Sequence, residues 1–248
     1  MRNSTSLSIV LSNFLRFTLT GLLCCLIADQ AIAASSNCNG FKTPESYLNA
    51  VGKQAVTELV KCGWNVNNSY RIHSGGDSIT VTALQLQVVG RNLKTVKELL
   101  DNGADPNFNP DRQNGTSALD SAISVQDYPM AFLLIQHGAD LNYIEPGLKM
   151  NVYMQLVYDK KQDANVDKLL EMLKKSGINP DYQEPKGRTA LHLAAALNNA
   201  AYAGKLLALN ANPCIRDKAG RLPLDVAIQR NHPEVRTLLE SRDGAKCH

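Results

Sequence analysis

The sequence has little net charge and few aromatic residues. Its 26 basic and 23 acidic residues leave a formal net charge of +3, far from the strong positive field of a nucleic-acid-binding protein. Aromatic residues make up 6% of the chain, with a single tryptophan, which is low for a large β-sandwich or barrel. The hydrophobic share of 44% is ordinary for a globular protein and excludes wholesale disorder. We expect no nucleic-acid partner.

The motifs of common enzyme classes are also missing. The sequence contains no phosphate-binding loop, no GxSxG nucleophile turn and no HExxH zinc motif. It has no CxxC pair and no Cys/His spacing typical of a zinc site, although His248 follows Cys247. We therefore expect no enzymatic activity, no metal ion and no other cofactor. The alternative is an active site built in an insertion, which a copurifying metal or cofactor would favour.

The first 33 residues have the pattern of an export signal. An apolar run over about 17–28 is followed by Ala31-Ile32-Ala33, the small-x-small pattern that signal peptidases recognise. The run is short for a membrane span, so an uncleaved anchor is the less favoured alternative, and Leu23 before Cys24 argues against a lipoprotein. We expect residues 1–33 to be a cleaved signal peptide. No later stretch is long and apolar enough to predict a membrane span.

Cysteine usage fits an exported protein. Two of the six cysteines leave with the signal peptide, and Cys38, Cys62, Cys214 and Cys247 remain. An even number of cysteines in an exported chain favours disulfide bonds.

Self-similar segments recur along the chain at intervals of 33 to 40 residues. The segment 187–195 (GRTALHLAA) is followed 33 residues later by 220–228 (GRLPLDVAI). A second marker follows each apolar helix, where a glycine just past the helix end can take a left-handed conformation. Its copies are GWNVN from Gly63, GADPN from Gly103, GADLN from Gly138, GINPD from Gly177 and NANP from Asn210.

The pattern resembles the ankyrin repeat over nearly the whole mature chain. The segment 189–194 matches the family's T-P-L-H-x-A opening, except that Ala190 replaces proline, and 96–105 matches the family's closing motif. The resemblance implies an all-α solenoid of about six helix-turn-helix units joined by hairpin-like loops, because one unit cannot bury its own apolar face. We expect a lead-in over 34–42, a repeat domain over 43–246 and a tail over 243–248. The units are expected at about 43–68, 80–110, 111–146, 147–181, 182–216 and 217–242.

Two insertions interrupt the repeat, at 69–78 and 158–165. Loops on a scaffold often carry function but also vary harmlessly, and the sequence leaves both readings open. The solenoid itself restricts disulfide pairing, because its ends are too far apart for a bond between them. Cys38–Cys62 and Cys214–Cys247 are therefore the expected pairs, each stapling one terminal unit.

The resemblance gives the histidines structural roles. His192 occupies the family position that hydrogen-bonds the backbone of the adjacent turn, and His137 and His232 occupy other common family positions. His73 and His248 are isolated and indicate no site. Trp64 is expected to pack against the Cys38–Cys62 bond.

The resemblance also implies a protein-binding surface. In ankyrin proteins, the turn tips and exposed first-helix positions form a concave face that binds other proteins. Its mostly basic character here favours an acidic patch on the partner, and a solvated charged face without a partner is the alternative. Carried over by position, the face contains Arg112, Gln113, Ser124, Lys186, Arg188, Lys218, Arg221, Gln229 and Arg230.

Together these features predict a non-enzymatic protein that binds a partner protein in the periplasm. The short leader and Ala-x-Ala site are typical of bacterial export, and secretion is the alternative. The resemblance to exported ankyrin proteins implies a partner or protector of an exported enzyme. Two further alternatives stay open, an immunity protein that neutralises a toxin acting in the periplasm and a secreted host-directed effector.

Overall fold

The computed structural model describes residues 44–52, 55–74, 77–110, 116–158, 164–241 and 247. The predicted signal peptide and the lead-in lie outside these residues. The chain divides into two compact units, residues 1–118 and 119–248, where the sequence predicts one repeat domain over 43–246. Each unit is described by itself.

The described part of the first unit contains two helix pairs with a β-hairpin between them. Thr82 caps the second pair, because its hydroxyl accepts a hydrogen bond from the Gln85 N–H at 3.1 Å while the Gln85 side chain accepts one from the Thr82 N–H at 2.8 Å. The elements are α2 (Pro44–Ala50), α3 (Val56–Lys61), β1 (Ser69–Ser74), β2 (Asp77–Thr82), α4 (Ala83–Val89) and α5 (Leu93–Asp101).

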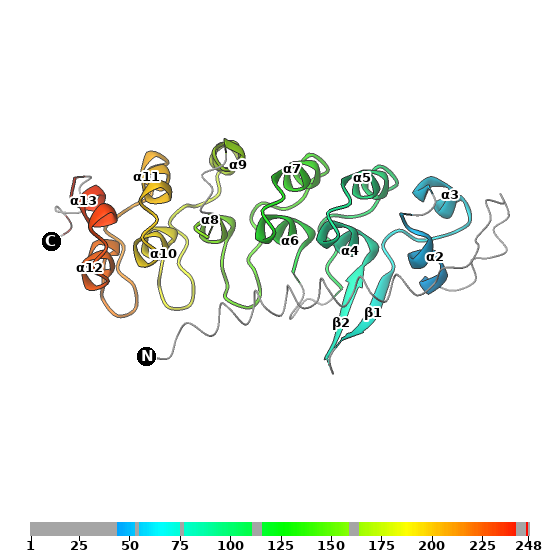
Figure 1. Ribbon diagram of the computed structural model, residues 1–248, viewed down its shortest axis with the longest axis horizontal. Helices are drawn as coiled ribbons and strands as arrows, with labels where there is room; N and C mark the ends of the chain where they lie inside the picture. Colours follow the sequence, from blue (N-terminus) through cyan, green and yellow to red (C-terminus); the bar gives the residue numbers. More distant parts are fainter. Residues whose placement is uncertain are drawn as a thin grey trace. The chain divides into compact units, whose positions relative to one another are not determined.

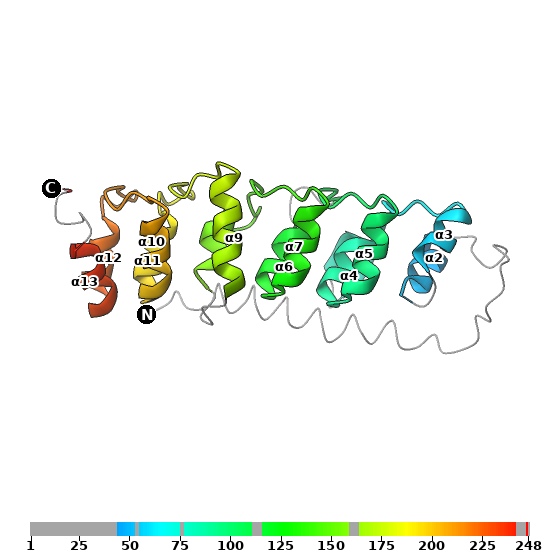
Figure 2. The same cartoon turned by 90° about the horizontal axis from the view of Figure 1, so that it is seen from above.

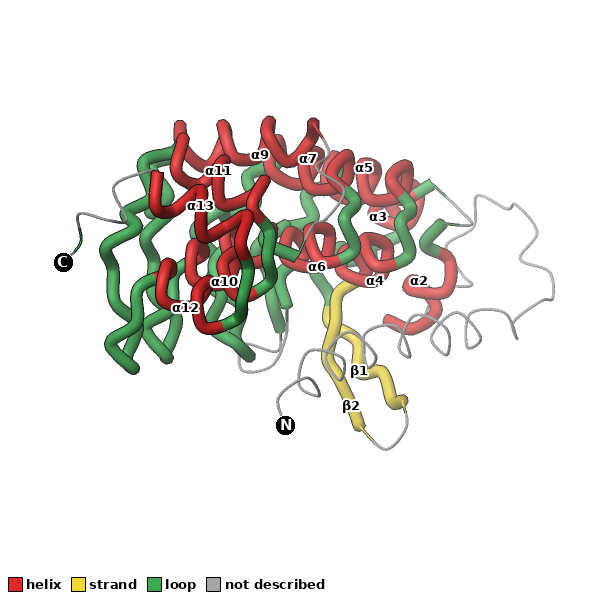
Figure 3. The backbone as a smooth tube through the Cα atoms, turned by 60° about the vertical axis from the view of Figure 1, so that its left-hand side comes forward, coloured by secondary structure: helices red, strands yellow, loops and turns green. Residues whose placement is uncertain are grey.

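The insertion predicted at 69–78 falls within a β-hairpin, which is an addition to the predicted all-α solenoid. Strands β1 and β2 pair antiparallel from Ser69↔Thr82 to Ser74↔Asp77, and Figure 3 shows them extending from the helices. Buried Trp64 holds the base of the hairpin, because its indole N–H donates to the Tyr70 hydroxyl at 2.8 Å. This contact is a role for Trp64 that the sequence did not predict.

The second unit repeats the helix pair. In Figure 1 the first helices, α6, α8, α10 and α12, form one row, and the second helices, α7, α9, α11 and α13, form another. Seen from above, the two helices of a pair overlap (Figure 2). The helices are α6 (Ala118–Ser124), α7 (Tyr128–Gln136), α8 (Val152–Leu156), α9 (Ala164–Lys175), α10 (Ala190–Ala196), α11 (Ala200–Ala208), α12 (Pro223–Gln229) and α13 (Pro233–Ser241).

The predicted repeat architecture is confirmed, with the hairpin as an addition. Among the described residues there are six helix pairs, and each lies inside one of the six predicted units. The helices pack closely because their contact positions are small: Ala194, Ala195 and Ala227 are completely buried. The second predicted insertion, 158–165, falls mostly outside the described residues.

The closing motifs have a physical explanation in their side-chain hydrogen bonds. Gly103 and Gly138 follow the helix ends with φ of +88° and +89°, a conformation that favours glycine. Two residues on, the Asp105 and Asp140 carboxylates each accept a hydrogen bond at 2.8 Å from the backbone N–H two residues later. The G-A-D-x-N pattern therefore encodes a helix stop followed by a tight turn.

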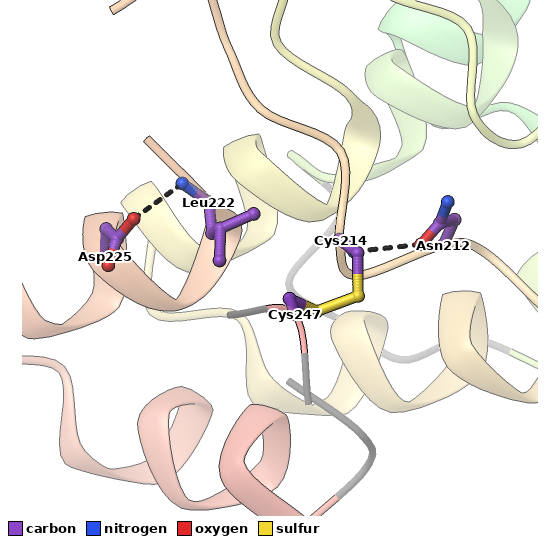
Figure 4. Close-up of a disulfide and its surroundings, with 5 residues drawn as sticks. All are labelled: Asn212, Cys214, Leu222, Asp225 and Cys247. Atoms are coloured by element: carbon purple, nitrogen blue, oxygen red, sulfur yellow. Dashed lines mark hydrogen bonds between the residues drawn. A yellow bond between two sulfur atoms is a disulfide. The ribbon is translucent and has the colours of Figure 1, made fainter. Parts of the chain in front are cut away.

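A disulfide ties the C-terminal end of the second unit to the loop after α11. Cys214 and Cys247 are bonded with a Cα–Cα distance of 5.2 Å, and the Cys214 N–H donates to the Asn212 side chain at 2.9 Å (Figure 4). The structure thus contains the C-terminal pair that the solenoid argument selects. Cys62 is also disulfide-bonded, and its predicted partner Cys38 lies outside the described residues.

Candidate protein-binding surface

Most of the predicted binding residues fall in three places in the second unit. Arg112 and Gln113 lie outside the described residues. Ser124 is exposed at the end of α6, and Gln229 and Arg230 are exposed at the end of α12. The remaining four, Lys186, Arg188, Lys218 and Arg221, come together in two neighbouring turns.

These two turns are short hairpins of the same design, residues 183–188 and 216–221, which we name the paired hairpins. In the first, the Glu184 N–H donates to the Arg188 carbonyl at 3.1 Å. In the second, the Asp217 N–H donates to the Arg221 carbonyl at 2.9 Å. Each hairpin leads into a first helix, α10 or α12, so the repeat fixes its position relative to the helices.

Arg188 and Arg221 are each paired with an acid of their own hairpin. The Arg188 guanidinium contacts the Glu184 carboxylate at 2.9 Å, and that of Arg221 contacts Asp217 at 2.7 Å. Both carboxylate side chains are nearly buried, 5% and 2% exposed, so each arginine compensates a charge that the fold has removed from water. These arginines hold the hairpins together.

The pKa values of the two acids reflect this pairing. Burial raises the pKa of Glu184, but hydrogen bonds from Arg188 and from the Lys186 and Arg188 N–H groups outweigh it and leave the pKa below its ordinary value. The same balance lowers the pKa of Asp217 beside Arg221. Both carboxylates are therefore ionised at neutral pH, as the ion pairs require.

The paired hairpins are also joined to each other. The Lys218 N–H donates to the Lys186 carbonyl at 2.9 Å, and the Gln183 side-chain amide donates to the Gly187 and Arg216 carbonyls at 2.7 and 3.1 Å. Gly187 has a φ of +77°, and a Cβ there would lie 2.8 Å from the Lys218 nitrogen, so glycine permits this close approach.

Three cations of the paired hairpins remain directed to solvent. Lys186 and Lys218 are exposed and form no ion pair among the described residues, and exposed Arg216 donates to the Gly220 carbonyl at 2.7 Å. The sequence interpretation missed Arg216 and the two buried acids. The signal was present, because EPKGR and DKAGR place an acid four residues before an arginine at an interval of 33.

A cleft of about 480 Å³ lies between the paired hairpins. Its lining includes Gln183, Pro185, Gly187, Arg216 and Lys218, so cationic and neutral polar groups face it alongside the paired acids. Among the described residues, no cluster of histidine, cysteine and carboxylate side chains has the composition of a metal site. The described helices also include none with the length and hydrophobicity needed to cross a bilayer.

The histidines make structural hydrogen bonds. His192 is buried, its Nδ1 accepts from the Thr189 N–H at 3.1 Å, and its Nε2 therefore donates to the Arg221 carbonyl at 3.0 Å. Burial lowers the pKa of His192, with the hydrogen bond to Arg221 opposing the shift, so the ring is neutral at pH 7. His137 and His232 contact the Leu133 and Ala195 carbonyls at 2.9 and 2.8 Å.

The third residue of each first helix marks a difference between repeats. Gln85, like His192, donates to the next repeat, since its amide contacts the Thr116 carbonyl at 2.8 Å. Asp120 occupies this position in α6 and is 4% exposed. Burial and the negative charge of Glu145 raise its pKa to about 7, against the opposing effect of the Gln155 side chain.

Comparisons with known proteins agree with this architecture. The family model for ankyrin repeats (3 copies) matches residues 47–145 and 154–248. An ankyrin repeat protein of Acanthamoeba polyphaga mimivirus is 31% identical over 147 residues, which is 59% of this chain and 17% of that protein. The nuclear factor NF-kappa-B p105 subunit of Gallus gallus is 28% identical over 238 residues, which is 94% of this chain. The chain spans less than a quarter of either relative, 17% and 23%.

A solved structure shares the fold. It is titled as the Bd0816 predatory endopeptidase from Bdellovibrio bacteriovorus in complex with immunity protein Bd3460, and the matched chain has a TM-score of 0.63 and 24% identity. The match covers 80% of this chain and 96% of that chain. Ankyrin repeats are protein-interaction modules that typically lack catalytic activity. With its family match over most of its length and its six helix pairs among the described residues, this chain belongs to the ankyrin-repeat family.

Proposed function

We propose that the protein is an exported, periplasmic interaction protein that binds a partner protein through its turn tips and exposed first-helix positions. The observation that carries the proposal is the ankyrin-repeat match over 47–145 and 154–248. The Cys214–Cys247 bond supports export, because disulfides persist in oxidising compartments such as the periplasm. The exposed Lys186 and Lys218 support a partner with an acidic surface.

Affinity capture followed by rebinding tests the binding function. The exported form of the chain is immobilised, proteins are captured from a periplasmic extract, and each captured protein is purified and titrated against the free chain. We expect one partner to form a saturable complex of defined stoichiometry. Failure of every purified candidate to rebind would overturn the proposal.

The location has its own test. N-terminal sequencing of the protein purified from its native source should give a chain beginning at Ala34, the residue after the predicted cleavage site. Recovery from the periplasmic fraction should accompany this result. A chain that retains residues 1–33 in the cytoplasmic fraction would contradict export.

A role as an immunity protein is the second candidate. The fold likeness to a chain of the endopeptidase–immunity protein complex covers 96% of that chain, and this coverage brings the candidate forward. In this role the bound partner would be an enzyme acting in the same compartment. The activity of the purified partner separates the roles, because an immunity protein inhibits it at a stoichiometric ratio and a protector leaves it active.

A further inference from the structure

We propose that the cleft between the paired hairpins receives an acidic segment of the partner protein, whose carboxylates contact Arg216 and Lys218 in the cleft and exposed Lys186 on the adjoining hairpin. The inference rests on the proposed binding function and narrows it to one place and one partner chemistry.

Charge is the first argument. The paired hairpins, 183–188 and 216–221, contain five basic and two acidic residues, a net charge of +3 that equals the formal net charge of the whole chain. The two acids are nearly buried and contact Arg188 and Arg221, so they do not neutralise the outer cations. The positive charge is therefore concentrated on twelve residues and directed to solvent, where it attracts carboxylates.

Preorganisation is the second argument. The two ion pairs, the Lys218-to-Lys186 backbone hydrogen bond and the two bonds from Gln183 already hold the hairpins in one arrangement. A partner that enters the cleft need not order these loops, so less of its binding energy is lost to entropy.

The preceding hairpin, residues 145–150, shows that the feature is local. It also closes with a backbone hydrogen bond, although one residue longer, because the Glu145 N–H donates to the Met150 carbonyl at 2.9 Å. It contains one acid and one lysine, for a net charge of zero, and Leu148 at its tip is 39% exposed. The concentration of cations in the paired hairpins is thus not shared by the described hairpin 145–150.

The cleft favours an extended acidic segment over a small ion or an apolar helix. Its volume of about 480 Å³ can hold one or two side chains. Its lining includes the cations Arg216 and Lys218 and the amide of Gln183, and its two acids, Glu184 and Asp217, are already ion-paired with Arg188 and Arg221. Lys186 and Arg216 lie on different hairpins, so carboxylates at alternate positions of one extended segment contact both.

A peptide titration tests the chemistry without the native partner. The ¹⁵N-labelled exported chain is titrated with a synthetic twelve-residue peptide of alternating Glu and Ala. We expect amide shifts concentrated at 183–188 and 216–221, and about a tenfold loss of affinity for Lys186→Glu/Lys218→Glu. The matched control Lys174→Glu/Lys175→Glu makes the same charge change on exposed residues of α9 and should bind as the wild type does.

Several results would overturn the inference. Shifts spread over α9 and α11, equal losses in both double variants, or tighter binding of a single-stranded oligonucleotide than of the acidic peptide would each contradict it. The purified partner then separates this inference from the proposed function. If the partner binds the wild type and Lys186→Glu/Lys218→Glu equally, the function stands and the acidic-segment site fails; if no partner binds at all, the function fails.

Discussion

The last two repeats of the second unit and the two before them satisfy their buried polar groups differently. In the last two, His192 donates to the Arg221 carbonyl at 3.0 Å, and the Asp225 carboxylate accepts from the Leu222 N–H at 2.8 Å (Figure 4). In the two before them, Asp120 has its pKa raised to about 7, and buried Gln155 forms no hydrogen bond of normal geometry, although its side chain lies near enough to Asp120 to lower that pKa.

The difference shows what the T-P-L-H position contributes. A side chain that both accepts from its own cap and donates to the next repeat joins two repeats, as His192 does. Met154, the third residue of α8, has no polar hydrogen and cannot donate to the next repeat. The buried polar groups of the middle repeats therefore lower the stability of the fold. The last two repeats are joined by hydrogen bonds, and they carry the paired hairpins.

Replacement of Asp120 should give the largest effect. Because its pKa is about 7 in the fold and 3.8 ordinarily, the folded state keeps a proton that the unfolded state loses, and stability falls as the pH rises from about 4 to about 7. Asp120→Asn removes this loss of stability. The free energy of unfolding of the variant, relative to that of the wild type, should therefore increase by about 4 kcal/mol between pH 4 and pH 8. Urea unfolding at each pH measures it, with exposed Glu171→Gln as the control; a pH-independent difference would refute the account.

Loss of a buried hairpin acid should give the next largest effect. Asp217→Asn leaves Arg221 without its charge partner and should cost about 3 kcal/mol in the free energy of unfolding. Glu145→Gln changes the equivalent acid of the preceding hairpin, which has no arginine, and should cost less than about 1 kcal/mol. Equal costs in chemical denaturation would remove the distinction between the two regions.

Replacing either of two buried polar residues should change the stability in opposite directions. His192→Leu removes the hydrogen bonds to Thr189 and Arg221 and should destabilise the second unit by about 2 kcal/mol. Gln155→Met removes a buried amide that forms no hydrogen bond of normal geometry, and it should stabilise the unit by about 1 kcal/mol at acidic pH, where Asp120 is neutral. Thermal and urea midpoints give the comparison, and destabilisation by both changes would contradict it.

The smallest effect comes from two glycines with the same backbone. Gly187 and Gly220 both have a φ of +77°, but a Cβ would contact the Lys218 backbone only at Gly187. Gly220→Ala should cost about 1 kcal/mol for its conformation alone, and Gly187→Ala measurably more. Equal costs would show that the close approach of the hairpins is not tight.

Much of this architecture is readable from the sequence, because its signals are local. The G-A-D-x-N motifs predict helix stops, and the T-A-L-H segment predicts the hydrogen bonds of His192. The β-hairpin was missed although alternating residues flank Gly75-Gly76, a pattern typical of a two-residue hairpin turn. The raised pKa of Asp120 could not be anticipated, since it comes first from burial and then from the charge of Glu145, a residue 25 positions away, and both depend on the folded chain.

The binding surface shows the same limit. The sequence indicates a basic face. Which of its cations are ion-paired and which are exposed depends on distances that only the fold sets. Arg188 and Arg221 contact buried acids, whereas Lys186 and Lys218 remain exposed. Charge reversal at the two arginines would therefore test folding, and reversal at the two lysines tests binding.

Hydrogen–deuterium exchange of the exported chain, alone and with its purified partner, tests the central claim most directly. We expect binding to slow exchange in 183–188 and 216–221 and to leave the exchange rates of the second helices α9 and α11 unchanged. Slower exchange confined to α9, α11 or the β1–β2 hairpin, with the paired hairpins unaffected, would contradict it.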